Sequence, residues 1–171
     1  MSVSAERYPF IRRILHWLSA AIILWGLCSG FMLVLADVPE SVHHWIAAFN
    51  VATTLVFFPF FLLRLALALM QKKPTTPGLT QRQQRIAGWG HQAIYAAVLV
   101  VLVSGVLMME RPMPVYGLAT LQPLLDASVV TYGFAILHRI SNLILALLVA
   151  GHIAAVVMHK RRGVPLLYKM V

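Results

Sequence analysis

Charged residues are scarce in this chain. Only 11% of its 171 residues are charged, whereas 60% are hydrophobic. A soluble domain of this length could not bury so much apolar surface, so the composition excludes an ordinary soluble fold. The length is that of one domain, and we expect a single domain over residues 1–171.

Cysteine is almost absent as well. The single one, Cys28, lies within an apolar stretch. One cysteine excludes an internal disulfide framework, an iron–sulfur ligand set and the Cys-x-x-Cys-His attachment of a c-type haem. Zinc sites use clusters of cysteine, histidine and carboxylate, and the long apolar stretches contain no Asp or Glu. Any metal group inside them must therefore rely on histidine.

The formal net charge is +9, which in a soluble protein could indicate nucleic-acid binding. Here the basic residues lie in short clusters between long apolar stretches. Such clusters usually set the orientation of membrane spans. We therefore expect no nucleic-acid partner and expect the lipid bilayer as the main surroundings.

Four apolar stretches are long enough to cross a bilayer, which takes about 20 residues. They cover residues 14–36, 44–70, 87–109 and 136–159. The sequence therefore predicts an all-α membrane protein built as a bundle of four transmembrane helices. Pro59 lies inside the second span, where a proline removes one backbone hydrogen bond and is expected to kink the helix.

The charges predict the orientation of this bundle. Lysine and arginine gather in the N-terminal tail, the second connection and the C-terminal tail, whereas the first connection has only acidic charges. The positive-inside rule then places both termini in the cytoplasm. The third connection, residues 110–135, is the longest. We expect it to form a lid at the outer surface, with a short interfacial helix as the alternative.

The seven histidines carry the chemistry. Most lie inside or at the edge of the predicted spans, where polar side chains are costly and usually functional. In the predicted orientation they form two layers. The cytoplasmic layer contains His16, His91, His152 and His159, and the outer layer contains His43, His44 and His138.

His138 and His152 show the clearest spacing. They are 14 residues apart (152 − 138), which on a helix gives nearly the same face and a separation of about 21 Å. One helix thus offers an imidazole to each layer, as two stacked haems b would require, because haem b needs axial imidazoles and an apolar pocket. The alternative is that these are polar residues on a packed face.

Arginine side chains could pair with the anionic haem propionates near the membrane edge. Arg64, late in the second span, is our candidate for that role. Arg12, Arg13 and Arg139 are more simply explained by snorkelling toward the interface.

At this point the chain resembles the bacterial cytochrome b561 family, the four-helix type that includes superoxide:quinone oxidoreductase. The matching motifs are residues 14–18 (ILHWL), Arg64 with Leu65, residues 90–95 (GHQAIY) and residues 151–155 (GHIAA). Their order covers nearly the whole chain. The resemblance implies two haems b, with ligands in the first, second and fourth spans.

The resemblance also implies the roles of individual residues. His16 and His152 would bind the iron of the cytoplasmic-side haem, and His138 would bind the outer haem with a partner from the second span. The family register places that partner at Asn50, which is a poor iron ligand. We therefore expect His43 or His44 to bind iron instead, His43 being one heptad from Asn50 and on a similar face.

The resulting hypothesis is electron transfer through haem b in the bacterial inner membrane. The electrons would pass between an outer donor, superoxide or a redox protein, and membrane quinone, as in an oxidoreductase of the superoxide oxidase type. A quinone site would lie near His91, His159 and the basic residues Lys72, Lys73 and Arg85, because quinone reduction takes up protons.

Two alternatives stay open at the level of the sequence. The first is a haem b anchor and electron-relay subunit of a larger respiratory dehydrogenase or hydrogenase, which would co-purify with a catalytic partner. The second is a small membrane protein without haem, which would be colourless when purified.

Overall fold

The computed structural model describes residues 7–70, 78–126, 128–164 and 166–170. Four long helices dominate these residues, and each is long and apolar enough to cross a membrane. This confirms the predicted all-α, four-helix membrane bundle. The helices are α1 (Phe10–Leu35), α2 (Glu40–Met70), α3 (Gln81–Leu107) and α4 (Val129–Arg161).

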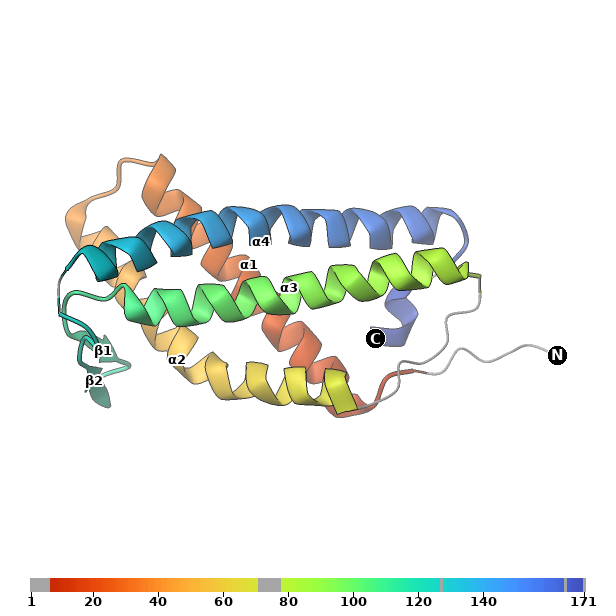
Figure 1. Cartoon of the computed structure of the whole chain (residues 1–171), viewed down its shortest axis with the longest axis horizontal. Coiled ribbons are helices and arrows are strands. Elements are labelled where there is room, and N and C mark those ends of the chain that lie inside the picture. Colours follow the sequence, from red (N-terminus) through yellow and green to blue (C-terminus); the bar gives the residue numbers. More distant parts are fainter. Residues whose placement is uncertain (1–6, 71–77, 127, 165, 171) are drawn as a thin grey trace.

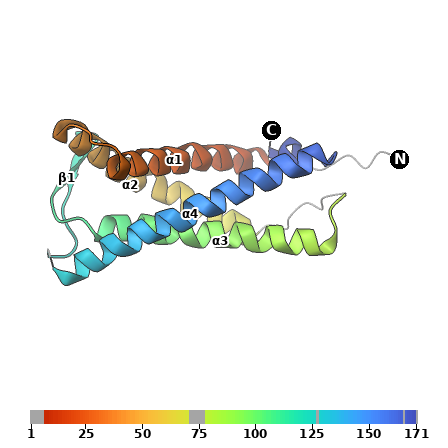
Figure 2. The same cartoon turned by 90° about the horizontal axis from the view of Figure 1, so that it is seen from above.

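The four helices lie side by side in an elongated bundle (Figure 1). α1 begins and α4 ends at one end, which we call the terminal end; the opposite end is the hairpin end. Seen from above, α4 starts over α3 at the hairpin end and crosses toward α1 at the terminal end (Figure 2). Along this crossing His152 of α4 comes near His16 of α1, their ring centres being 6.5 Å apart.

The apolar core lies midway between the two ends. Every helix contributes to it, and α2 continues through Pro59 as a single helix. The core therefore separates the polar side chains at the terminal end from those at the hairpin end. Its buried members are Leu27, Phe57, Phe61, Val98, Leu102 and Leu145.

All four helices begin earlier than hydropathy predicted, and α3 and α4 differ the most. α3 begins at Gln81 rather than near residue 87, and α4 begins at Val129 rather than near residue 136. Thr80 and Ser128 form capping boxes at these two starts, each accepting backbone hydrogen bonds that the first helical turn would otherwise leave unmade. His138 therefore lies nine residues into α4 (138 − 129), about 14 Å from its start, and does not open the helix as expected.

The third connection contains a β-hairpin instead of a short helix. Strands β1 (Met113–Val115) and β2 (Ala119–Leu121) pair antiparallel. The turn between them has positive φ at Tyr116 (49°) and Gly117 (72°), the backbone twist that suits a tight hairpin. The Tyr116 hydroxyl bonds with that of Thr53 at 2.7 Å, which ties the hairpin to α2.

The C-terminal segment folds back at the terminal end. A short 3-10 helix, η1 (Leu166–Met170), follows α4. The indole nitrogen of Trp17 donates to the carbonyl oxygen of Met170 at 2.8 Å, and the backbone nitrogen of Tyr8 donates to that of Lys169 at 3.1 Å. These two hydrogen bonds join the N-terminal part of the chain to η1, next to the site described below.

Candidate functional site

Three histidines from three helices meet at the terminal end. The ring centres of His16 (α1) and His152 (α4) are 6.5 Å apart, and those of His91 (α3) and His152 are 5.2 Å apart. All three side chains are half-buried. The structure thus brings together three residues of the predicted cytoplasmic layer, although 61 residues or more separate His152 from the other two (152 − 91).

The distance between ring centres indicates which two of these histidines could bind one haem iron. An imidazole nitrogen binds a transition-metal ion at about 2 Å, so two rings on opposite sides of one ion have centres roughly 6 Å apart. His16 and His152, at 6.5 Å, fit that spacing, whereas His91 and His152, at 5.2 Å, are too close. The donor set therefore fits a bis-imidazole haem on His16 and His152.

Arg64 lies inside the same cluster. Its Nη2 is 3.0 Å from Nδ1 of His16, and its guanidinium carbon lies 5.3 Å from the centre of the Tyr95 ring. A guanidinium can only donate hydrogen bonds, so Nδ1 of His16 is the acceptor. The predicted functional arginine of the second span is thus in direct contact with a predicted ligand.

A cavity of about 420 Å³ adjoins this cluster. That volume is within the range of small-molecule sites. Most of its wall is apolar and comes from α1, α2 and α3, but several polar side chains face it. These are Tyr8, Arg12, His16, Arg64, Gln84, His91, Gln92 and Tyr95.

Only some of the residues predicted for a quinone site line this cavity. His91 lines it, whereas His159 and Arg85 are not part of its wall. Lys72 and Lys73 lie outside the described residues. Nδ1 of His91 donates to the carbonyl oxygen of Ala87 at 2.6 Å, which leaves Nε2 as the proton-accepting nitrogen of the neutral ring.

Tyr8 adds a hydrogen-bond donor to the wall of this cavity. Burial raises the pKa of Tyr8 above its usual value, and the nearby Tyr95 acts in the same direction. The guanidinium of Arg12, 4.5 Å from the ring centre, lowers that pKa and only partly offsets the rise. The Tyr8 hydroxyl therefore keeps its proton at neutral pH and can donate a hydrogen bond.

His138 is held firmly against α3 in the half of the bundle nearer the hairpin end. Its Nδ1 lies 3.1 Å from the carbonyl oxygen of Val101 and 3.2 Å from the hydroxyl oxygen of Ser104. A carbonyl oxygen only accepts, so Nδ1 carries the ring proton and Nε2 keeps a free lone pair. A backbone partner on the second nitrogen is the usual way in which a metal-binding imidazole is oriented.

The structure does not bring His43 and His44 to the depth of His138. Both side chains are exposed, and His44 pairs with Glu40 at 3.3 Å. They lie three and four residues from the start of α2 at Glu40 (43 − 40, 44 − 40), at most about 6 Å along the helix. His138 lies about 14 Å into α4. The depth match that the sequence suggested between these residues was therefore wrong.

Asn50 is the residue of α2 that matches His138 in depth, ten residues from the helix start (50 − 40). Its side chain is fully engaged with α1. The amide nitrogen donates to the Ser29 hydroxyl at 3.0 Å, and the amide oxygen accepts from the Trp25 indole nitrogen at 2.9 Å. Asn50 thus joins α1 to α2 in the half of the bundle nearer the hairpin end.

Three residues around the histidines were not singled out from the sequence. Tyr95 lies four residues after His91, so helical spacing already placed both on one face. Ser104 and Gly105 contact His138, and a Cβ on Gly105 would come within 3.1 Å of its Cε1 atom. Two adjacent small residues in a span indicate a close approach by another group, which is a signal that the sequence contained.

Among the described residues no three His, Cys, Asp or Glu side chains come together as a metal site. His16 and His152 thus offer a pair of imidazoles, the donor set of a bis-histidine haem, and not a larger cluster. The family model described as prokaryotic cytochrome b561 matches residues 7–171 of the chain. No curated protein matches the chain.

Proposed function

We propose a function from one premise: the chain belongs to the prokaryotic cytochrome b561 family, whose members transfer electrons through haem b in membranes. This chain is a multi-pass membrane protein of that family. The proposal is that it passes electrons between a donor at the hairpin end and membrane quinone at the terminal end. The donor would be superoxide or a redox protein, and the membrane the bacterial inner membrane.

His16 and His152 are the proposed ligands of the inner haem. Their ring separation of 6.5 Å and their half-buried position support this assignment. Arg64, already in contact with His16, is the proposed partner of a propionate. Haem b, when bound, supplies a one-electron iron couple, while the protein supplies ligands, an apolar shell and fixed charges.

His138 is the proposed ligand of a second, outer haem. Its orientation by Val101 and Ser104, with Nε2 free, supports the assignment. Its second ligand stays a prediction from the sequence, His43 or His44, although they lie about 8 Å nearer the start of their helix than His138 does. Asn50, at the matching depth, is engaged with Trp25 and Ser29.

The cavity at the terminal end is the proposed quinone site. Its apolar wall suits a hydrophobic ring and tail, and the polar side chains at the wall suit the two quinone oxygens. The Tyr8 hydroxyl and the Arg64 guanidinium can donate hydrogen bonds there. His91, whose Nδ1 carries the ring proton, can use Nε2 to accept and pass on the protons that accompany quinone reduction.

One observation carries the proposal: His16 belongs both to the imidazole pair and to the wall of the cavity. A proposed haem ligand is therefore in contact with the space in which the electron acceptor would bind. His159, which is absent from the cavity wall, stays a weaker candidate for the quinone site.

The test is the rate at which a soluble quinone analogue oxidises the dithionite-reduced protein. His91→Ala should slow this step by about 10²-fold, the usual contribution of a positioned acid–base group. Arg82→Gln, an exposed change on the same helix outside the cavity, is the matched control and should react like the wild type. Unchanged rates in both His91→Ala and His159→Ala would refute the quinone assignment.

A further inference from the structure

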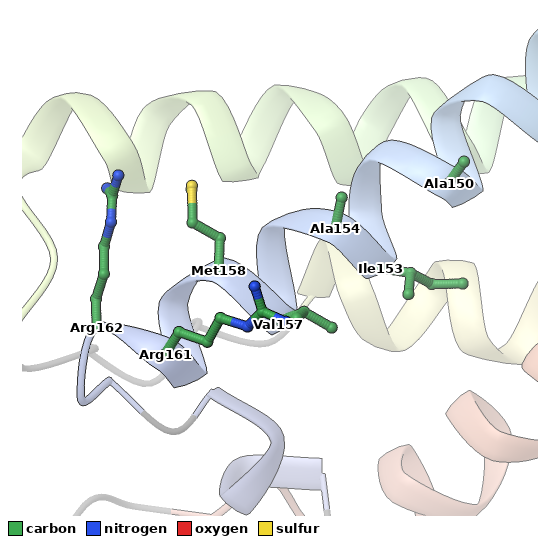
Figure 3. A pocket seen from close by; sticks show the side chains of 7 residues that line it. All are labelled: Ala150, Ile153, Ala154, Val157, Met158, Arg161 and Arg162. Carbon is green, nitrogen blue, oxygen red and sulfur yellow. The ribbon is translucent and has the colours of Figure 1, made fainter.

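We infer that a groove on the membrane-facing side of α4 binds one anionic phospholipid of the cytoplasmic leaflet. The groove is a hollow of about 710 Å³ along the last three turns of the helix (Figure 3). Its apolar part consists of Ala150, Ile153, Ala154, Val157 and Met158, and Arg161 and Arg162 end it at the terminal end.

The groove has the shape and length that one lipid chain requires. Its residues recur every three or four positions, so they form one face of the helix. Ala150 and Ala154 are small, which makes a hollow between larger neighbours. From Ala150 to Arg161 there are eleven residues (161 − 150), or about 17 Å, close to the roughly 15 Å thickness of the hydrocarbon in one leaflet.

No described part of the protein covers this face. α4 is the least buried of the four spans. Ile153 and Val157 remain 49% and 45% exposed although they lie within a membrane-spanning helix. Apolar side chains at this depth contact lipid chains, so the lower part of the groove already has a hydrocarbon environment.

The charges at its end specify an anionic headgroup. Arg161 runs back along the helix and Arg162 extends sideways from it (Figure 3), and neither guanidinium has a carboxylate partner among the residues that the structure describes. A guanidinium fork matches the geometry of a phosphate and binds it through two hydrogen bonds. Basic pockets at the cytoplasmic ends of spans bind anionic lipid headgroups in this way.

A second copy of the chain fits this groove poorly. Two copies in one membrane share the same orientation, so the arginines of one would face the terminal end of the other. The described acidic residues, Asp37, Glu40, Glu110 and Asp126, lie away from that end, whereas arginine and lysine gather at it. Like charges would therefore repel, while an anionic lipid neutralises them.

The experiment measures binding of phosphatidylglycerol to the detergent-solubilised holoprotein by native mass spectrometry, with phosphatidylcholine as the neutral comparison. The wild type should retain one phosphatidylglycerol in preference to phosphatidylcholine. The double change Arg161→Gln with Arg162→Gln should weaken this binding about thirtyfold, about fivefold for each arginine. Ala154→Trp, which fills the hollow and keeps both charges, should also abolish it.

The matched control is Arg82→Gln with Lys160→Gln, which removes two exposed charges at the terminal end outside the groove. It should bind the lipid like the wild type, and haem content should be unchanged in every variant. Equal binding by the Arg161/Arg162 variant, an equal loss in the control, or no preference over phosphatidylcholine would overturn the inference. Cross-linking of two copies through Ala154→Cys in lipid bilayers would overturn it as well, by showing that protein occupies the groove.

Discussion

Arg64 donates a hydrogen bond to His16, with Nη2 of the guanidinium 3.0 Å from Nδ1 of the imidazole. Because Nδ1 accepts, the proton of the neutral ring is on Nε2 in this arrangement. An imidazole that binds iron through Nε2 carries its proton on Nδ1 instead and has nothing to offer a guanidinium. Ligation by His16 through Nε2 therefore requires Arg64 to release Nδ1, and the released guanidinium is then available to a propionate.

Arg64→Met should lower the midpoint potential of the inner haem. A cation close to a redox group favours the reduced form, which has one positive charge less. Its removal should shift the potential by on the order of 50–100 mV at a protein dielectric near 20. Arg64→Lys keeps the charge and should retain most of the wild-type potential. Potentiometric titration of the haem bands measures both variants, and an unchanged potential in Arg64→Met would contradict the assignment.

Gly105→Ala should disturb His138 specifically. The added Cβ would lie 3.1 Å from Cε1 of the His138 ring, so the ring must move by a few tenths of an ångström. Groups that orient a metal ligand typically change metal affinity by about 10- to 100-fold when they are altered. We therefore expect loss of the outer haem from Gly105→Ala, seen as reduced haem content.

The control for this change is Gly133→Ala on α4. A Cβ at Gly133 has no neighbour within 4 Å, and alanine there should only favour the helix. Haem content should stay at the wild-type value. Equal haem loss in both variants would show that the effect arises from the helices and not from the His138 contact.

The proposal of a second, outer haem predicts two haems per chain. His138→Ala should reduce this to one, because the inner pair His16 and His152 is unaffected. The double change His43→Ala with His44→Ala should have the same effect if one of them is the second ligand. One haem per chain in the wild type would refute the second haem, and two haems in the double variant would refute only the ligand assignment.

Much of the fold could be predicted because the bilayer imposes a strong length requirement. Each span appears in the sequence as an apolar stretch, and the structure forms a helix over each of them. The helix starts were predicted less well. The first residues of α3, 81–85, are polar or charged, so hydropathy began the span too late, whereas the capping box at Thr80 determines where the helix begins.

The hairpin and the C-terminal helix were not predicted for a different reason. β1 and β2 contain three residues each, too short for an alternating pattern to be recognised. What stabilises the hairpin is its tertiary contact with α2 through Tyr116 and Thr53. Contacts of this kind depend on which elements meet, and sequence spacing does not contain that information.

The candidate site could likewise be predicted only in part. His16, His152 and His138 could be selected from their depth, their spacing and the family resemblance. That His91 joins the first two depends on the crossing of α4 from α3 toward α1 (Figure 2). That Arg64 bonds to His16 depends on how α2 packs against α1. The supposed match between His43, His44 and His138 was wrong because the start of α4 was placed seven residues too late (136 − 129).

The central claim is that His16 and His152 hold the inner haem, and haem content with the reduced-minus-oxidised absorption spectrum tests it most directly. His16→Ala and His152→Ala should each remove the inner haem and its share of the b-type bands. His159→Ala changes the same residue type on the same helix, away from the imidazole pair, and should keep the wild-type spectrum. Full haem content and unchanged spectra in both His16→Ala and His152→Ala would contradict the account.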